Sequence, residues 1–300
     1  MKVRAWVPGL PSAARDDQYP CERMLPKAPL SWQTCPKTRA AGDRAMQTFD
    51  SDGVSIAYLD LAPTGEGSGD PIVLIHGFAS SHAVNWVNTQ WTKTLTHAGR
   101  RVVLYDNRGH GRSQKLYDPE AYHSNIMAED ARRLMDHLSI ERADIMGYSM
   151  GARISSHLTL AHPERVRSLL LGGLGIHLVE GVGLPLGIAD AMEAPSLADL
   201  TDPMQRMFRA FAENTGSDLR ALAACIRGTR QTLSKEEVGK IAVPTLVSVG
   251  TKDDVSGSGP ELAALVPGAE SFAIEGRDHN LAVGDRTHKQ AVVEFLARRP

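Results

Sequence analysis

The sequence predicts a doubly wound α/β fold with a mostly parallel sheet and an inserted helical cap. Three observations lead to this prediction. Short, wholly apolar runs recur along the chain, a pattern typical of strands buried on both faces of a covered sheet. Amphipathic helical segments alternate with these runs, as they do in parallel α/β sheets. One segment, residues 176–240, is mostly helical and interrupts the alternation, so we expect it to form the cap.

Each expected element follows from its local pattern. Apolar runs predict strands at residues 54–59, 72–75, 102–105, 143–146, 166–171, 245–249 and 272–274. Amphipathic patterns predict helices at residues 85–97 and 121–138, and further helical patterns lie at residues 152–161 and 292–297. The third helix should stop at His162, because a residue that precedes proline disfavours the helical conformation. These elements assign residues 46–175 and 241–300 to the α/β core.

Residues 1–45 differ from the rest of the chain. They contain six prolines and no sustained hydrophobic period, and eight Lys or Arg against four Asp or Glu give them a net charge of +4. We therefore expect a disordered N-terminal extension. A targeting peptide is a weaker alternative, because Asp16 and Asp17 are unusual in one. A start of the native protein at Met46 is a third hypothesis.

Composition narrows the partners and the compartment. The net charge of −2 gives no reason to expect nucleic acid or an acidic membrane surface as a partner. The most apolar region, residues 169–192, is interrupted by polar residues and glycines, so we do not expect a membrane span. The cysteines Cys21, Cys35 and Cys225 lack zinc-site spacing, and their odd, sparse number favours a reducing compartment. We therefore expect a cytoplasmic protein.

The strongest chemical signal is Gly147-Tyr148-Ser149-Met150-Gly151, which matches G-x-S-x-G between an expected strand and an expected helix. A serine on such a sharp turn adopts a strained backbone, and its neighbours two residues away must be small. Glycines at both of these positions meet that requirement. The context makes Ser149 the expected nucleophile rather than an ordinary serine in a Gly-rich turn.

A second motif, His76-Gly77-Phe78, directly follows an early strand. Acyl transfer places negative charge on the carbonyl oxygen, and backbone N–H groups must point at that oxygen. At this type of turn one donor belongs to the residue after the nucleophile, Met150, and the other to the loop after an early strand, here Phe78. His76 could be mistaken for a catalytic base, but we expect it to hold this loop by hydrogen bonds.

A third motif runs from Asp106 to Ser113 with the sequence D-N-R-G-H-G-R-S. Two glycines between an Asp and a Ser suit a tight turn after a strand. A phosphate-binding loop of the P-loop type would need a lysine that is missing here. We therefore expect this segment to support the floor of the active site.

The expected acid and base come last in the chain. A serine hydroxyl needs a base, and the base needs an orienting carboxylate. Asp253 and Asp254 follow the sixth expected strand, and His279 follows the seventh, where parallel sheets place their sites. The order Ser, Asp, His is also the one expected for this type of turn. His279 is the expected base, and Asp253 is the expected acid, preferred to Asp254 for its spacing from Gly250.

Together and in this order, the motifs resemble those of the α/β-hydrolase superfamily, across residues 50–298. The stretch from Asp106 to Ser113 is similar to that of the branch that holds small-molecule esterases, lactonases, C–C bond hydrolases, perhydrolases, epoxide hydrolases and dehalogenases. Members that open epoxides or remove halogens carry Asp as the nucleophile, so Ser149 disfavours those two activities. Relatives often place a proline four or five residues after the acid. Here Pro260 comes later, which keeps Asp254 as an alternative.

The expected activity is hydrolysis of a small-molecule carboxylic ester or lactone through an acyl-enzyme, without a metal or an organic cofactor. One alternative is a C–C bond hydrolase of a dioxo acid, which would need a cationic cap. Four arginines lie in the cap at a spacing more typical of a solvated helix face: Arg206, Arg209, Arg220 and Arg227. The other alternative is a ligand-binding protein, which need not keep all of Ser149, Asp253 and His279. The fold class does not determine the substrate, and the oligomeric state is open.

Overall fold

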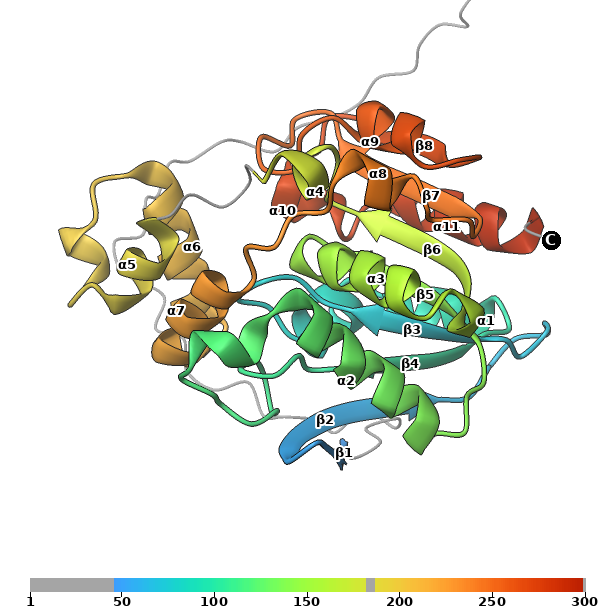
Figure 1. Cartoon of the computed structure of the whole chain (residues 1–300), viewed down its shortest axis with the longest axis horizontal. Coiled ribbons are helices and arrows are strands. Elements are labelled where there is room, and N and C mark those ends of the chain that lie inside the picture. Colours follow the sequence, from blue (N-terminus) through green and yellow to red (C-terminus); the bar gives the residue numbers. More distant parts are fainter. Residues whose placement is uncertain (1–45, 182–186, 299–300) are drawn as a thin grey trace, which may run out of the picture. The chain divides into compact units, whose positions relative to one another are not determined.

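The computed structural model describes residues 46–181 and 187–298, so the extension expected at residues 1–45 lies outside the described residues. An eight-stranded sheet runs through this part of the chain in the order β1-β2-β4-β3-β5-β6-β7-β8 (Figure 1). β2 pairs antiparallel with β1 and with β4, and the other neighbours are parallel. The strands are β1 Gln47–Ser51, β2 Val54–Leu61, β3 Pro71–Ile75, β4 Arg101–Tyr105, β5 Ala143–Tyr148, β6 Val166–Gly172, β7 Thr245–Gly250 and β8 Glu270–Ile274. The predicted α/β fold with a mostly parallel sheet is confirmed, and β1 is the strand that the sequence pattern missed.

Helices cover both faces of this sheet. Successive strand residues point to opposite faces, so Val73 and Ile75 of β3 join one apolar core while Ile72 and Leu74 join another. Side chains of α2, α3 and α9 fill the first core, and side chains of α1 and α11 fill the second. These helices are α1 Trp91–His97, α2 Ser124–His137, α3 Met150–Ala161, α9 Gly259–Leu265 and α11 Arg286–Arg298. This arrangement explains why the central strands read as continuous apolar runs.

The prediction of a single helix at residues 85–97 is wrong. The chain instead forms a short π-helical turn at Ala83–Val87 and then α1. Between them, Gln90 has a φ of 67°, in the left-handed region that a right-handed helix cannot include. The apolar periodicity continued across this break because Trp86 and Trp91 both face the same core.

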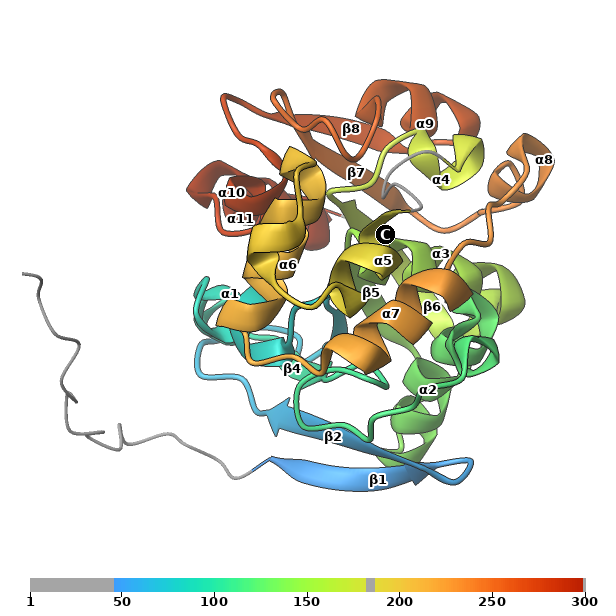
Figure 2. The same cartoon turned by 90° about the vertical axis from the view of Figure 1, so that its left-hand side faces the viewer.

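Between β6 and β7 the described chain is mostly helical, in the segment expected to form the cap. The helices are α4 His177–Glu180, α5 Gly187–Glu193, α6 Pro203–Asn214, α7 Leu219–Gly228 and α8 Lys235–Val238. α5 packs against α6 and α7, and this group lies beyond the carboxyl ends of the parallel strands (Figures 1 and 2). Loops at that end of the sheet therefore lie beneath helices rather than in open solvent.

None of the helices in the described ranges is long and apolar enough to cross a membrane.

Candidate active site

The turn between β5 and α3 holds Ser149 in a strained backbone. Its φ of 55° and ψ of −116° lie outside the regions that residues with a side chain normally adopt. The Ser149 N–H donates a 2.8 Å hydrogen bond to the Gly172 carbonyl of β6, which fixes the turn against the sheet. A Cβ at Gly147 would lie 2.1 Å from the Gly151 carbonyl oxygen, and one at Gly151 would lie 1.9 Å from that of Ile75. Both glycines are therefore required by the close approach of backbone, as the motif predicts.

Three loop ends bring Ser149, His279 and Asp253 together. Ser149 follows β5, Asp253 follows β7, and His279 begins the short helix α10, His279–Ala282, after β8. The Ser149 Oγ lies 2.9 Å from His279 Nε2, and His279 Nδ1 lies 2.9 Å from Asp253 Oδ2. The Asp254 side chain is exposed and makes no hydrogen bond to His279. The geometry thus joins the acid preferred from the sequence, and not its neighbour, to the histidine.

Hydrogen bonds keep Asp253 ionised. Its Oδ1 accepts from the backbone N–H groups of Val255 and Ser256 at 2.9 and 3.0 Å, and its Oδ2 accepts from the Ser256 hydroxyl at 2.6 Å. Burial opposes ionisation, but the bonds from His279, Ser256 and Val255 outweigh it and lower the pKa of Asp253 below its usual range. An ionised Asp253 accepts the Nδ1–H of His279. The lone pair of His279 therefore lies on Nε2, which faces Ser149.

Two residues that support this set were not identified from the sequence. Ser256, described above, orders the acid loop. Tyr148 precedes the nucleophile, and its buried hydroxyl donates a 2.6 Å hydrogen bond to the backbone carbonyl of His279. The Tyr148 ring also lies against the imidazole, with 5.5 Å between centroids. The first variable position of the G-x-S-x-G pattern, Tyr148, thus makes a contact that positions His279, and this contact becomes visible only in the fold.

Phe78 and Met150 border the same cavity as Ser149. Within residues 46–181 and 187–298, neither N–H donates a hydrogen bond to another group. Met150 is the first residue of α3, where backbone N–H groups lack intrahelical acceptors and the helix dipole favours negative charge. Both residues expected to supply the oxyanion donors therefore border a cavity that Ser149 also borders.

His76 holds the loop that carries Phe78. The ring Nε2 of His76 accepts from the Asn107 N–H at 2.9 Å, so its proton is on Nδ1, which donates to the Gly77 carbonyl at 2.8 Å. Burial lowers the pKa of His76 to about 4, in spite of the nearby Asp106 carboxylate. His76 is thus a neutral, buried residue whose ring faces backbone groups. These contacts match the loop-holding role expected for it.

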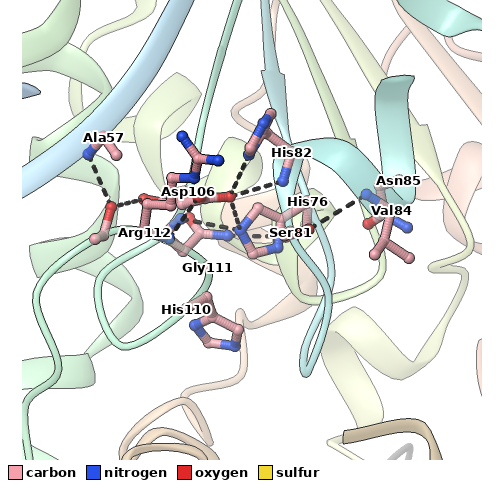
Figure 3. A network of polar contacts seen from close by, with 12 residues as sticks. Ala57, His76, Ser81, His82, Val84, Asn85, Asp106, His110, Gly111 and Arg112 are labelled. Atoms are coloured by element: carbon pink, nitrogen blue, oxygen red, sulfur yellow. Dashed lines mark hydrogen bonds and ion pairs between the residues drawn. The ribbon is translucent and has the colours of Figure 1, made fainter. Parts of the chain in front are cut away.

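Asp106 is the centre of a second polar network (Figure 3). Its Oδ1 accepts from the backbone and the Nδ1 of His82, both at 2.8 Å, and its Oδ2 accepts from the Arg112 N–H at 2.8 Å. Burial opposes ionisation, yet these bonds hold the pKa of Asp106 well below its usual range. A Cβ at Gly111 would lie 2.1 Å from Asp106 Oδ2, which explains the second glycine of the motif. The segment contacts the loop of His76 and His82, and its contacts are those of a structural turn.

Ser149 lies between two cavities. One is bordered by Phe78, Met150, Arg153 and other residues of the described chain. The other is bordered by His279, Tyr148 and Phe211, among others. The described side chains contain no group of three or more His, Cys, Asp or Glu with the geometry of a metal site. The side chains that meet at Ser149 are this serine, a histidine and, behind the histidine, a carboxylate.

The four arginines in the segment expected to form the cap make their contacts away from both cavities at Ser149. Arg209 is buried and donates to backbone carbonyls and to Glu213, so it is not part of a solvated face. Arg206 donates to the carbonyls of Leu197 and Leu200. The remaining two are exposed partners of other side chains: Arg227 pairs with Glu193, and Arg220 lies over the Tyr117 ring. None of the four borders either cavity at Ser149.

Residues 70–223 match the family described as the alpha/beta hydrolase fold. The chain belongs to this family. The match includes the Ser149 turn and the His76 and Asp106 motifs, whereas Asp253 and His279 lie beyond its end.

Its relatives in the family differ in activity. The chain is 33% identical over 151 residues to a 2-hydroxymuconate semialdehyde hydrolase from Pseudomonas sp. (strain CF600), and the alignment spans 49% of each chain. It is 26% identical over 276 residues to the non-heme chloroperoxidase CPO-A1 of Kitasatospora aureofaciens, covering 82% of this chain and 97% of that one. The structure of an enol-lactonase from Burkholderia xenovorans LB400 superposes with a TM-score of 0.67 at 22% identity, over 84% of this chain and 100% of that one. The last likeness shows the shared fold.

Proposed function

We propose that this hydrolase cleaves a carboxylic ester or lactone of a small molecule through an acyl-enzyme on Ser149. One observation carries the proposal: the hydrogen-bonded series from Asp253 through His279 to Ser149, with 2.9 Å at both contacts of the imidazole. A base within hydrogen-bond reach of the nucleophile, itself oriented by a carboxylate, is the geometry that serine acyl transfer requires. The cytoplasmic location expected from the cysteine content belongs to the same proposal.

The reaction has two steps in this geometry. His279 Nε2 takes the hydroxyl proton while Ser149 Oγ attacks the acyl carbonyl, and the N–H groups of Phe78 and Met150 stabilise the oxyanion. The imidazolium then protonates the departing alcohol, and the acyl group stays on Ser149. Water, deprotonated by His279, attacks the acyl-enzyme and releases the acid. The strained φ of Ser149 directs its Oγ into this position, and Asp253 stabilises the transient imidazolium.

The two cavities divide the substrate between them. The leaving group must lie beside His279, which protonates it, and His279 borders the second cavity. The acyl oxygen must lie beside the oxyanion donors, and both of these border the first cavity. The acyl chain therefore occupies the first cavity and the alcohol portion occupies the second.

The test is hydrolysis of short and medium-chain p-nitrophenyl esters by the purified chain and by Ser149→Ala. We expect turnover in the parent and its loss in the variant. A fluorophosphonate probe should label Ser149 in the parent, and peptide mass mapping would identify the labelled residue. Folded protein that neither turns over esters nor reacts with the probe would contradict the proposal and favour a binding role.

A second candidate uses the same three residues on a carbon–carbon bond of a dioxo acid. The match to a 2-hydroxymuconate semialdehyde hydrolase favours it, at 33% identity over about half of each chain. Probe labelling of Ser149 without ester turnover would support this candidate. A spectrophotometric assay with a ring-fission dioxo acid would then test it directly.

A further inference from the structure

Arg153 borders the cavity that the proposed mechanism assigns to the acyl chain. It lies four residues after Ser149 in the first turns of α3. Residues four apart lie on one face of a helix, about 6 Å apart along its axis. Ser149 and Arg153 therefore border the same cavity from neighbouring helical turns.

In the described part of the chain, the hydrogen bonds of the Arg153 guanidinium go only to neutral backbone carbonyls. Its Nη1 donates to the carbonyls of Gln231 at 2.8 Å and Leu178 at 3.3 Å, and its Nη2 donates to that of His177 at 3.0 Å. No carboxylate of the described chain forms an ion pair with Arg153, whereas most arginines in this part of the chain do form one. The Nε–H and one N–H of Nη2 donate to no group in residues 46–181 and 187–298. Two donors of the guanidinium thus have no acceptor among the described residues and could bind a ligand.

The surroundings of Arg153 disfavour an unpaired cation. Burial lowers the pKa of Arg153 to about 10, and the group is still protonated at neutral pH. A desolvated charge that lacks a counter-ion is costly, and an anionic ligand would offset that cost. Arg230 also borders the cavity, and none of the described residues that line it is acidic. Charge and open donors therefore both favour an anion at this end of the cavity.

We propose that Arg153 forms a carboxylate-binding subsite, so that the preferred acyl group carries a second carboxylate. This inference rests on the proposed function, because it assigns the acyl chain to the first cavity. A planar guanidinium recognises a carboxylate through two parallel hydrogen bonds. The spacing of about one helical turn fits two or three methylene groups between the reacting carbonyl and the carboxylate. The substrate class is thus a half-ester of a short dicarboxylic acid, or a lactone whose acyl chain carries a free carboxylate.

Equilibrium binding tests the subsite without any turnover. Monomethyl glutarate carries one carboxylate, and dimethyl glutarate is its neutral match. Calorimetry on the Ser149→Ala protein should show at least about 10-fold tighter binding of monomethyl glutarate, because a charge-assisted contact has that magnitude. Equal affinity for the two ligands would overturn the proposal whether or not any variant of Arg153 folds.

Substitution then assigns the effect to one residue. Adding Arg153→Met should remove the preference, and Arg153→Lys should restore part of it through charge without the paired donors. The matched control is Arg227→Met, at an exposed arginine that pairs with Glu193 outside the cavity, and it should keep the preference. Loss of the preference in Arg230→Met but not in Arg153→Met would overturn the assignment. A merely structural Arg153 would change the affinity for both ligands together.

Turnover separates this proposal from the previous one. The p-nitrophenyl esters of glutaric acid and of its monomethyl ester differ only in the free carboxylate, and we expect kcat/KM to favour the acid by about 10-fold or more. Ester turnover without that preference would retain the proposed function and overturn the subsite. Arg153-dependent binding of monomethyl glutarate without ester turnover would support the carboxylate subsite and contradict the proposed ester hydrolysis.

Discussion

Two histidine–aspartate pairs in this protein have nearly the same geometry and burial, but their surroundings differ. His279 Nδ1 lies 2.9 Å from Asp253, and His82 Nδ1 lies 2.8 Å from Asp106. In each pair the histidine side chain is 12% exposed and the carboxylate is fully buried. Each carboxylate also accepts backbone N–H groups, and its pKa lies below the usual range. The pair alone therefore does not define a catalytic site.

The outer nitrogen of each ring makes the difference. His279 Nε2 faces the Ser149 hydroxyl at 2.9 Å, on a strained turn between two cavities. His82 Nε2 has no hydrogen-bond partner among residues 46–181 and 187–298. Asp106 links the loop of His82 to the turn that contains Arg112 (Figure 3). In the proposed mechanism the first pair moves a proton, whereas the second pair holds two loops together. Four substitutions or conditions should separate these roles.

The largest effect is expected from Asp253→Asn. An amide at this position would favour the wrong tautomer of His279, with the proton on Nε2, and leave Ser149 without a base. We expect kcat for the best p-nitrophenyl ester to fall by about 10⁴-fold while the thermal midpoint changes little. Steady-state kinetics and a melting curve would measure both quantities.

The control for this variant is Asp254→Asn. The Asp254 side chain is exposed, so its replacement should change kcat less than about threefold. A large loss in Asp254→Asn, with Asp253→Asn nearly as active as the parent, would show that the acid has been assigned to the wrong neighbour.

Asp106→Asn should lower stability more than activity, the opposite of what we expect for Asp253→Asn. The asparagine would turn an N–H₂ group toward one of the donors from His82 or Arg112 and leave a buried group unpaired. We expect the free energy of unfolding to fall by about 3 kcal/mol, and kcat of the folded protein to fall less than about 10-fold. Denaturant unfolding and kinetics below the transition would measure the two changes. A loss of kcat as large as that of Asp253→Asn at unchanged stability would give this pair a chemical role.

The sequence could predict residues whose role depends on local backbone. Ser149 was recognisable because its turn demands two glycines, and those glycines meet backbone at about 2 Å from a hypothetical Cβ. His279 followed from the order of the motifs. Asp253 was preferred to Asp254 only by spacing, while in the structure the Val255 and Ser256 N–H groups turn its carboxylate toward the histidine.

Residues whose role depends on distant parts of the chain were missed. From the sequence, Arg153 is only one position of an expected helix, because the carbonyls that hold its guanidinium lie 24, 25 and 78 residues further along the chain. A cation four residues after the nucleophile, on the face of α3 that begins at Ser149, was the available signal. The break at Gln90 was hidden because the apolar period continues across a residue in the left-handed conformation.

The third prediction concerns pH and the histidine that lies between the two networks. Burial lowers the pKa of His76 to about 4, below the value of 6.5 expected in the unfolded chain. Between these values the unfolded chain binds more protons, so stability is full above about pH 6.5 and falls as the pH is lowered toward 4. His76 alone should contribute a slope of at most about 1.4 kcal/mol per pH unit.

Other buried histidines add to this slope. His110 and His288 have pKa values lowered by burial to about 3 and about 4. Denaturant unfolding of the parent and of His76→Gln at pH 5, 6 and 7.5 would isolate the share of His76, because the glutamine carbonyl can still accept the Asn107 N–H. A slope that is unchanged in the variant would mean that His76 binds protons equally in the folded and unfolded chain, so that burial does not lower its pKa.

The smallest effect is expected from His82→Gln. The glutamine amide can still donate to Asp106, and the backbone N–H of residue 82 continues to donate at 2.8 Å, so the carboxylate loses none of its partners. We expect the free energy of unfolding to change by less than about 1 kcal/mol and kcat by less than about threefold. Paired unfolding and kinetic measurements on this variant would check both values. A fall of 100-fold or more in kcat would mean that the imidazole of His82, and not only a hydrogen-bond donor to Asp106, is needed, and the distinction between the two histidine–aspartate pairs would no longer hold.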